Sequence, residues 1–206
     1  MQKLALTLSW LALAGAAAAQ ERLPMIPADK LSDAQKKAVA EMQGGAFGVG
    51  GPFLALLREP KLAEQAVAMA TYFRNESVLG TKLTELVILL AARDWSQQFE
   101  WTAHYSRALK AGLKLETVNA IAEGRRPTGM PEDEEVVYDF WSELEHSKSV
   151  SDATYDRAVK KFGEPGVVSI TALNGYYTML AMVLNVSRTP VLPANAQVPQ
   201  LPALPR

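Results

Sequence analysis

The chain has 206 residues, a formal net charge of −1, no cysteine and only two histidines. The absence of cysteine excludes thiol redox chemistry and thiolate metal sites, and the lack of a basic block leaves nucleic-acid binding without electrostatic support. A chain of this length builds one well-buried domain and is short for two.

Residues 1–19 have the composition of a secretory signal peptide. Lys3 precedes an apolar run, and the segment ends in consecutive alanines before Gln20. The run is too short to be a preferred membrane span, although a retained lipid-facing anchor is the alternative. We therefore expect a periplasmic or secreted protein with no membrane contact once the signal peptide is removed. The expected folded domain starts at residue 20.

A glycine-rich segment follows the first predicted helix. That helix begins with a capping box at residues 32–35 and continues to Met42. Residues 44–53 then contain five glycines and a proline, which predicts a loop. It is not a phosphate-binding loop, because no lysine follows and no apolar strand precedes it. Two interpretations stay open: a tightly packed connection, or a wall that faces a ligand.

Helical periodicity accounts for most of the remaining chain. The helix predicted over 82–95, with Thr81 as its cap, is apolar almost all round and is expected to be buried and central. Ser96 is expected to cap the helix after it. The apolar stretch 167–186 is nearly long enough to span a membrane, but its asparagines favour a buried core helix or a subunit-interface helix. Helices are predicted over 61–74, 82–95, 96–112, 115–123, 132–146, 152–163 and 165–186.

The C-terminal segment, residues 190–206, is rich in proline and has no periodicity. It is expected to be extended and poorly ordered. No strand pattern appears anywhere in the chain, so the sequence predicts an all-α fold in which residues 20–189 form a single helical-bundle domain.

The strongest candidate for chemistry is the pair formed by Glu100 and His104. Four residues separate them, so both side chains lie on one face of a helix and can touch. The same sector contains Gln97 and two alanines, which leave room beside the pair, and Trp101 is expected to wall the resulting pocket. A sheltered carboxylate fixes the tautomer of an imidazole, as a general base requires. The alternative is a solvated ion pair on the helix surface.

Three further residues complete the candidate set. Glu85, near the start of the most apolar helix, is either a second acid/base group that can orient His104 or a solvated first-turn carboxylate. Arg93 is expected to bind a substrate carboxylate. His146 fits cationic capping of a helix C-terminus. A metal site would need both histidines and a carboxylate to meet, and the spacing gives no support for this, so neither a metal nor a cofactor is predicted.

Several segments together resemble the carboxymuconolactone decarboxylase family of the alkylhydroperoxidase-like superfamily. The similarity covers about residues 35–190, and EWxxH at residues 100–104 is its most specific element. The resemblance implies an all-helical protomer that assembles into homo-oligomers, namely trimers or hexamers. The segments that carry it are 51–66, 83–92, 99–113 and 150–185.

The superfamily pattern also indicates which chemistry is lost. The peroxidase branch has a CxxCxxxH motif with an upstream glutamate. On this chain the histidine of the motif would fall on His104, its cysteines on Gln97 and Glu100, and the glutamate on Glu85. Both thiols are missing, so cysteine-based peroxide reduction is excluded. The resemblance instead implies cofactor-independent proton transfer on small lactones or carboxylic acids.

We therefore expect a lyase, decarboxylase or isomerase. His104 is its predicted base, Glu100 its partner or second acid and Glu85 the supporting carboxylate, while Gln97, Trp101 and Arg93 are predicted to bind substrate. One alternative is a non-catalytic member of the family that binds a small ligand. Another is a metal-dependent enzyme that uses both histidines and a glutamate.

Overall fold

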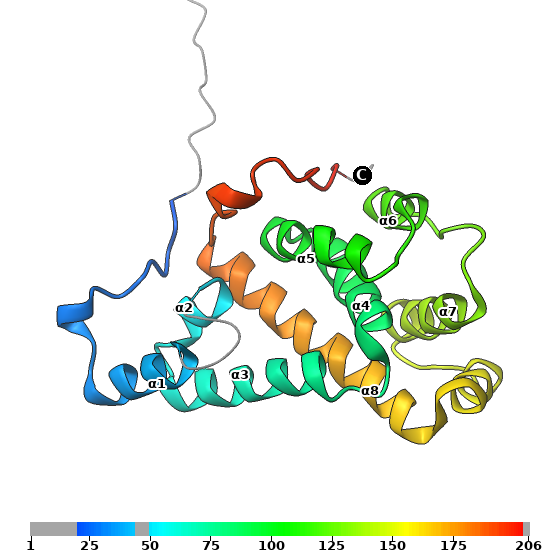
Figure 1. Cartoon of the computed structure of the whole chain (residues 1–206), viewed down its shortest axis with the longest axis horizontal. Coiled ribbons are helices and arrows are strands. Elements are labelled where there is room, and N and C mark those ends of the chain that lie inside the picture. Colours follow the sequence, from blue (N-terminus) through cyan, green and yellow to red (C-terminus); the bar gives the residue numbers. More distant parts are fainter. Residues whose placement is uncertain (1–19, 44–49, 204–206) are drawn as a thin grey trace, which may run out of the picture.

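The computed structural model describes residues 20–43 and 50–203. These residues form eight α-helices and two short 3₁₀ helices, without a strand, so the all-α class is confirmed (Figure 1). The predicted signal peptide and residues 44–49 of the glycine-rich segment lie outside the described residues. The α-helices are α1 (Asp33–Gln43), α2 (Pro52–Leu56), α3 (Pro60–Asn75), α4 (Gly80–Asp94), α5 (Gln98–Lys110), α6 (Leu115–Ala122), α7 (Glu132–Ser147) and α8 (Asp152–Ser187).

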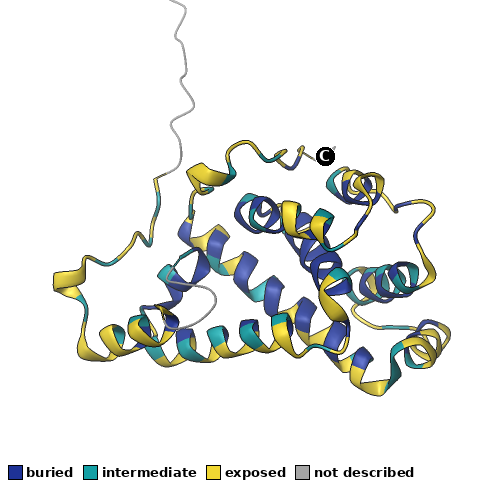
Figure 2. Cartoon of the chain, viewed as in Figure 1, coloured by how far each residue is buried: buried dark blue, intermediate teal, exposed yellow. Residues whose placement is uncertain are grey.

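Helix α4 is the centre of the bundle. All of its residues from Leu83 to Arg93 are buried, as its apolar sequence predicts (Figure 2). It packs against α3, α5, α6, α7 and α8. The predicted cap is wrong, because α4 begins at Gly80 and Thr81 lies inside its first turn.

The turn between α4 and α5 also differs from the prediction. Ser96 does not cap α5 but adopts a left-handed conformation, with φ of 48°. The cap is Gln97, whose side-chain oxygen accepts a hydrogen bond of 2.6 Å from the backbone amide of Phe99. Left-handed backbone at Ser96 reverses the chain within a few residues, so α5 folds back against α4.

Helix α8 contains a break where the sequence predicts a boundary between two helices. At Gly163 the backbone has φ of 69° and ψ of 173°, a conformation that glycine adopts without steric cost. Among the described residues, α8 is the one helix long and apolar enough to cross a membrane, yet half of its apolar window is buried inside the protein. A core helix of a soluble protein meets the same criteria.

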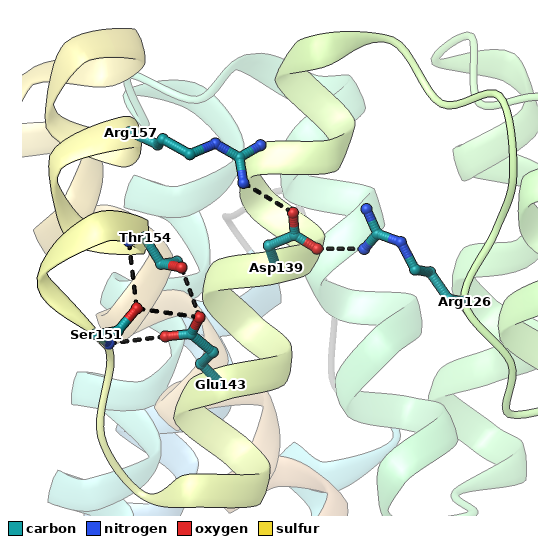
Figure 3. Close-up of polar contacts among 6 residues, drawn as sticks. All are labelled: Arg126, Asp139, Glu143, Ser151, Thr154 and Arg157. Carbon is teal, nitrogen blue, oxygen red and sulfur yellow. Dashed lines mark hydrogen bonds and ion pairs between the residues drawn. The ribbon is translucent and has the colours of Figure 1, made fainter.

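Two acidic side chains of α7 hold the start of α8 (Figure 3). Asp139 forms ion pairs with Arg126, which precedes α7, and with Arg157 of α8, at 3.1 Å. Glu143 accepts a hydrogen bond of 2.6 Å from the hydroxyl of Thr154. These contacts fix the outer part of the bundle, away from the cavity described below.

The described part of the C-terminal segment, residues 190–203, lies against the bundle. It is largely irregular, with one 3₁₀ turn at Pro193–Asn195, but it is not detached from the bundle (Figure 1). Leu201 is only 6% exposed, and the indole nitrogen of Trp101 donates a hydrogen bond of 2.9 Å to the carbonyl of Pro199. Donor side chains on the bundle thus satisfy backbone groups that a proline-rich segment cannot pair within itself.

Candidate active site

A cavity of about 440 Å³ opens between α3, α5 and α8, and residues at the start of α2 complete its wall. This volume is in the range of sites for small molecules. The cavity has an apolar part and a polar part. The side chains with polar groups in its lining are Arg74, Glu100, Thr102, His104, Ser106, Arg107, Tyr176, Tyr177 and Asn195.

His104 is part of this wall and lies between the carboxyl groups of Glu85 and Glu100. Its Nδ1 atom is 2.7 Å from Oε2 of Glu85 on α4, and its Nε2 atom is 3.6 Å from Oε2 of Glu100 on α5. His104, Glu85 and Glu100 are 5%, 6% and 4% exposed. A solvated surface pair, one of the two interpretations of the sequence, does not describe these side chains.

The contact with Glu85 determines which nitrogen of His104 can react. An ionised carboxylate only accepts hydrogen bonds, so Nδ1 carries the proton in the 2.7 Å contact. In the neutral imidazole, Nε2 then keeps its lone pair. His104 lines the cavity and Glu85 does not. Glu85 therefore orients the ring from behind, and Nε2 is the atom placed to take a proton.

The surroundings of Glu100 favour its neutral form. Burial raises the pKa of Glu100 above its ordinary value, and the nearby Glu85 adds to this rise, while His104 and Arg107 oppose it. A carboxyl group with a raised pKa keeps its proton at a higher pH than a surface glutamate does. The cavity therefore places a proton acceptor and a proton donor side by side.

Two neighbouring tyrosines of α8 have different roles at the cavity. The Tyr177 ring meets the His104 ring edge to face, with centroids 5.4 Å apart. Burial raises the pKa of Tyr177 well above its ordinary value, so its hydroxyl stays a donor. The Tyr176 hydroxyl is already used, because it donates a hydrogen bond of 2.7 Å to the carbonyl of Ala66.

Two arginines that were not among the predicted site residues also line the cavity. Arg74 comes from α3 and Arg107 from α5. Burial lowers the pKa of Arg74, and the positive charge of Arg107 lowers it further, which shows that the two cations act on each other. Arg107 was detectable, because it follows His104 by three positions on the same helix face. Nothing in the sequence connects Arg74 to this site.

The three residues predicted to bind substrate do not line the cavity. The Trp101 indole is buried under the C-terminal segment. Gln97 caps α5 and donates a hydrogen bond of 2.9 Å to the side chain of Asn185. Arg93 donates a hydrogen bond of 2.7 Å to the carbonyl of Pro202. Trp101 belongs to α5, Gln97 caps it and Arg93 belongs to α4, and all three side chains hold other parts of the chain.

The free space beside His104 follows the predicted sector of α5 only in part. Glu100 and His104 of that sector line the cavity, but Ala108 is completely buried in the core. From the pair the cavity extends instead along Ala103, Ser106 and Arg107. Ala108 therefore serves for core packing and not for ligand space.

The described end of the glycine-rich segment does line the cavity. Gly50 and Gly51 form part of its wall. Gly51 has φ of 56°, and a Cβ atom there would lie 2.6 Å from the ring of Phe99, so the backbone approaches this ring more closely than any side chain allows. Both of the interpretations left open by the sequence therefore hold for this end: it is closely packed, and it faces the cavity.

His146 does not belong to this site. Its Nδ1 atom is 2.7 Å from the carbonyl of Ser142 in its own helix, and it borders a separate hollow of about 120 Å³ together with Arg93. The two histidines therefore do not share a site. The part of the chain that the structure describes contains no group of three or more Asp, Glu or His side chains placed to hold a metal ion.

No protein-family model matches this chain, and a search of curated proteins found no matching relative. The resemblance to the carboxymuconolactone decarboxylase family therefore stays a prediction from the sequence. The geometry of the cavity defines the candidate site.

Proposed function

We propose that the protein is a cofactor-independent acid/base enzyme, a lyase, decarboxylase or isomerase that acts on a small lactone or carboxylic acid, as expected for the carboxymuconolactone decarboxylase family. One observation carries the proposal. An imidazole held at Nδ1 by a buried carboxylate presents its second nitrogen, beside a second carboxyl group, in the wall of a cavity of about 440 Å³.

The proposed chemistry is a proton transfer next to a carbonyl group. Nε2 of His104 takes a proton from the carbon, and the electron pair moves to the carbonyl oxygen. Glu85 stabilises the imidazolium that forms, and the Tyr177 hydroxyl donates a hydrogen bond to the enolate oxygen. A proton returned to another carbon completes an isomerisation. In a decarboxylation the electron pair comes from the bond to the departing CO₂, and the carbon receives a proton from the neutral carboxyl group of Glu100 or from the imidazolium form of His104.

Acid/base groups such as these can accelerate the proposed reaction substantially. A positioned general acid or base typically accelerates a reaction by about 10² to 10⁴-fold. No cofactor is needed for this step, because the carbonyl group of the substrate itself stabilises the negative charge that forms. The same cavity suits an anionic guest, since Arg74 and Arg107 line it and act on each other with like charge.

A hydrogen-exchange experiment tests the proposal without knowledge of the natural substrate. A panel of small lactones and carboxylic acids, including 4-carboxymuconolactone, is incubated with the protein in D₂O, and NMR follows both exchange of the protons next to the carbonyl group and loss of CO₂. We expect the wild-type protein to catalyse one of these reactions and His104→Gln to abolish it. His146→Gln is the matched control and is expected to keep full activity.

Equal turnover by His104→Gln and the wild type would overturn the proposal. Binding of an acid in the cavity without exchange or CO₂ release would instead identify the alternative, a ligand-binding member of the family. The substrate class has its own test, in which Arg107→Gln weakens binding of the acid about tenfold, whereas Lys110→Gln, an exposed change on the same helix, has no effect.

The proposal includes export and assembly. Cleavage of the signal peptide would leave a chain that begins near Gln20, which mass spectrometry of the mature protein measures.

Assembly into trimers or hexamers is supported by exposed apolar side chains on α3 and α8, where Met69, Tyr72 and Val168 surround a hollow of about 360 Å³. Light scattering of the wild type and of Val168→Asp tests it, and a monomeric wild type would contradict it.

A further inference from the structure

The C-terminal segment crosses the bundle close to the cavity. Residues 190–203 leave the end of α8 and pass over α5 towards α6 (Figure 1). Their first half contributes Leu192 and Asn195 to the cavity wall. A segment that the sequence predicts to be poorly ordered thus forms one side of the site that contains His104.

The near end of this segment is fixed to α8. The backbone amide of Thr189 donates a hydrogen bond of 3.2 Å to the carbonyl of Leu184, and the hydroxyls of Ser187 and Thr189 lie 2.7 Å apart. These contacts end α8 and direct the chain out across the cavity.

The far end is fixed to α4 and α5 by side chains that recognise its backbone. Gln98 forms two hydrogen bonds with Leu201, donating to its carbonyl at 2.9 Å and accepting from its amide at 3.0 Å. Trp101 and Arg93 donate to the carbonyls on either side, at 2.9 Å and 2.7 Å. Three donor side chains from two helices therefore hold four residues of chain.

The middle is held much less. Between Pro190 and Val198, the hydrogen bonds found among the described residues run within the segment itself, as from the amide of Asn195 to the carbonyl of Leu192 at 2.8 Å. Leu192, at the cavity, is 46% exposed although it is apolar. Two fixed ends and a loosely attached middle make this part of the wall able to move while the rest of the bundle stays in place.

We propose that residues 190–203 form a strap that controls the access of molecules to His104, with Leu192 and Asn195 as the residues that meet a guest at the mouth of the cavity. This inference holds whether the cavity is catalytic or only binds a ligand. It also gives a reason for Gln98, Trp101 and Arg93: they hold the strap and thereby shape the site without touching it.

The reactivity of the two histidines tests the proposal directly. Diethyl pyrocarbonate acylates unprotonated imidazole, and peptide mass spectrometry measures the rate at His104 and at His146 in the same sample. His146 is exposed and does not line the cavity, so it serves as an internal reference. In the full-length protein we expect His104 to react more slowly than His146.

Two variants loosen the strap to different degrees. Gln98→Ala removes both hydrogen bonds to Leu201 and is expected to raise the His104 rate, relative to His146, by about tenfold, which corresponds to ~1.4 kcal/mol. A chain that ends at Thr189 is expected to give a larger increase. Gln197→Ala, an exposed change in the strap away from the cavity, is the matched control and leaves the ratio unchanged.

Leu192→Ala removes the apolar side chain at the mouth of the cavity and is also expected to raise the ratio. A ratio equal to the wild-type ratio in both Gln98→Ala and Leu192→Ala, with circular dichroism confirming that both are folded, overturns the proposal. These point variants decide the question even where the shortened chain does not fold. An unchanged ratio together with full turnover in the exchange assay would reject the strap and leave the proposed function intact.

Discussion

The Nδ1 atom of His104 lies 2.7 Å from Oε2 of Glu85, although the two residues are 19 positions apart and come from different helices. This contact joins α5 to the buried centre of α4. It sets the orientation of the imidazole ring and leaves Nε2 in the cavity wall. The chemistry of the site therefore depends on how two helices pack and not on the helix of His104 alone.

Glu85→Gln is expected to lower kcat in the proton-exchange assay by about 10² to 10⁴-fold. The substitution keeps the shape of the side chain but removes the negative charge that stabilises the imidazolium. The amide group can also turn and donate to Nδ1, which would select the wrong tautomer. Glu116→Gln, an exposed change, is the control. An unchanged kcat in Glu85→Gln would show that the contact with His104 is only structural.

Glu100→Gln is expected to gain stability relative to the wild type as the pH rises. Burial raises the pKa of Glu100 above its unfolded value of 4.5, so the neutral form contributes stability that is complete below pH 4.5 and is lost as the pH rises through the raised pKa. Glutamine carries no such loss. Urea denaturation of both proteins at a series of pH values from 4.5 to 8 measures the difference, and a difference that does not change with pH contradicts the prediction.

Glu143→Gln is expected to show the opposite dependence. Hydrogen bonds from Thr154 and then Ser151 lower the pKa of Glu143 below 4.5, so its contribution to stability is present above pH 4.5 and disappears as the pH falls through the lowered pKa. The variant should therefore be less stable than the wild type at neutral pH and approach it in acid. Urea denaturation at neutral pH and at a series of pH values below 4.5 tests this, and loss of stability that persists in acid would contradict it.

Gly51→Ala is expected to destabilise the fold by about 2 kcal/mol, through the strain of a positive φ and a clash with Phe99. Gly50→Ala is a matched control one residue away, because nothing lies within 4 Å of a Cβ atom there. Chemical denaturation measures both. Equal stability of the two variants would show that the backbone at Gly51 has room to shift.

Tyr176→Phe and Tyr177→Phe are expected to separate stability from binding. Tyr176→Phe leaves the carbonyl of Ala66 without its side-chain donor and should cost about 1 kcal/mol. Tyr177→Phe removes a hydroxyl for which no protein partner is found among the described residues, so it should change the melting temperature little and weaken binding of a carboxylic acid in the cavity. Calorimetry measures both quantities, and the reverse pattern would contradict the assignment of the two hydroxyls.

The helices and their limits were largely predictable from local signals. The capping box at Ser32 is present, with the Ser32 amide 3.0 Å from the Gln35 side chain and the Gln35 amide 3.2 Å from the Ser32 hydroxyl. The burial of α4 followed from its composition. Ser96 was mistaken for a cap because serine is a good cap by type, whereas the turn there is set by the packing of α5 against α4.

The candidate site was only partly predictable. The pairing of Glu100 with His104 follows from helical spacing, and Glu85 was placed near them by the superfamily pattern. Gln97 and Trp101 were assigned to the cavity from their helical positions in and beside the sector of Glu100 and His104, and Arg93 because its guanidinium group suits a carboxylate. The structure uses them to hold other parts of the chain, and the same donor groups serve either purpose.

The sequence by itself determined that the chain is helical, that α4 is buried and that a carboxylate and an imidazole share one face of a helix. These properties depend on residues within a few positions of one another. Only the tertiary structure decided that the hollow beside His104 extends towards Ser106 and Arg107 and not towards Ala108, that Glu85 reaches Nδ1, and that Arg74, Tyr177 and the C-terminal segment meet at the same cavity. Such contacts join residues far apart in the chain, and they follow from how whole helices fill space against each other, which local spacing does not encode.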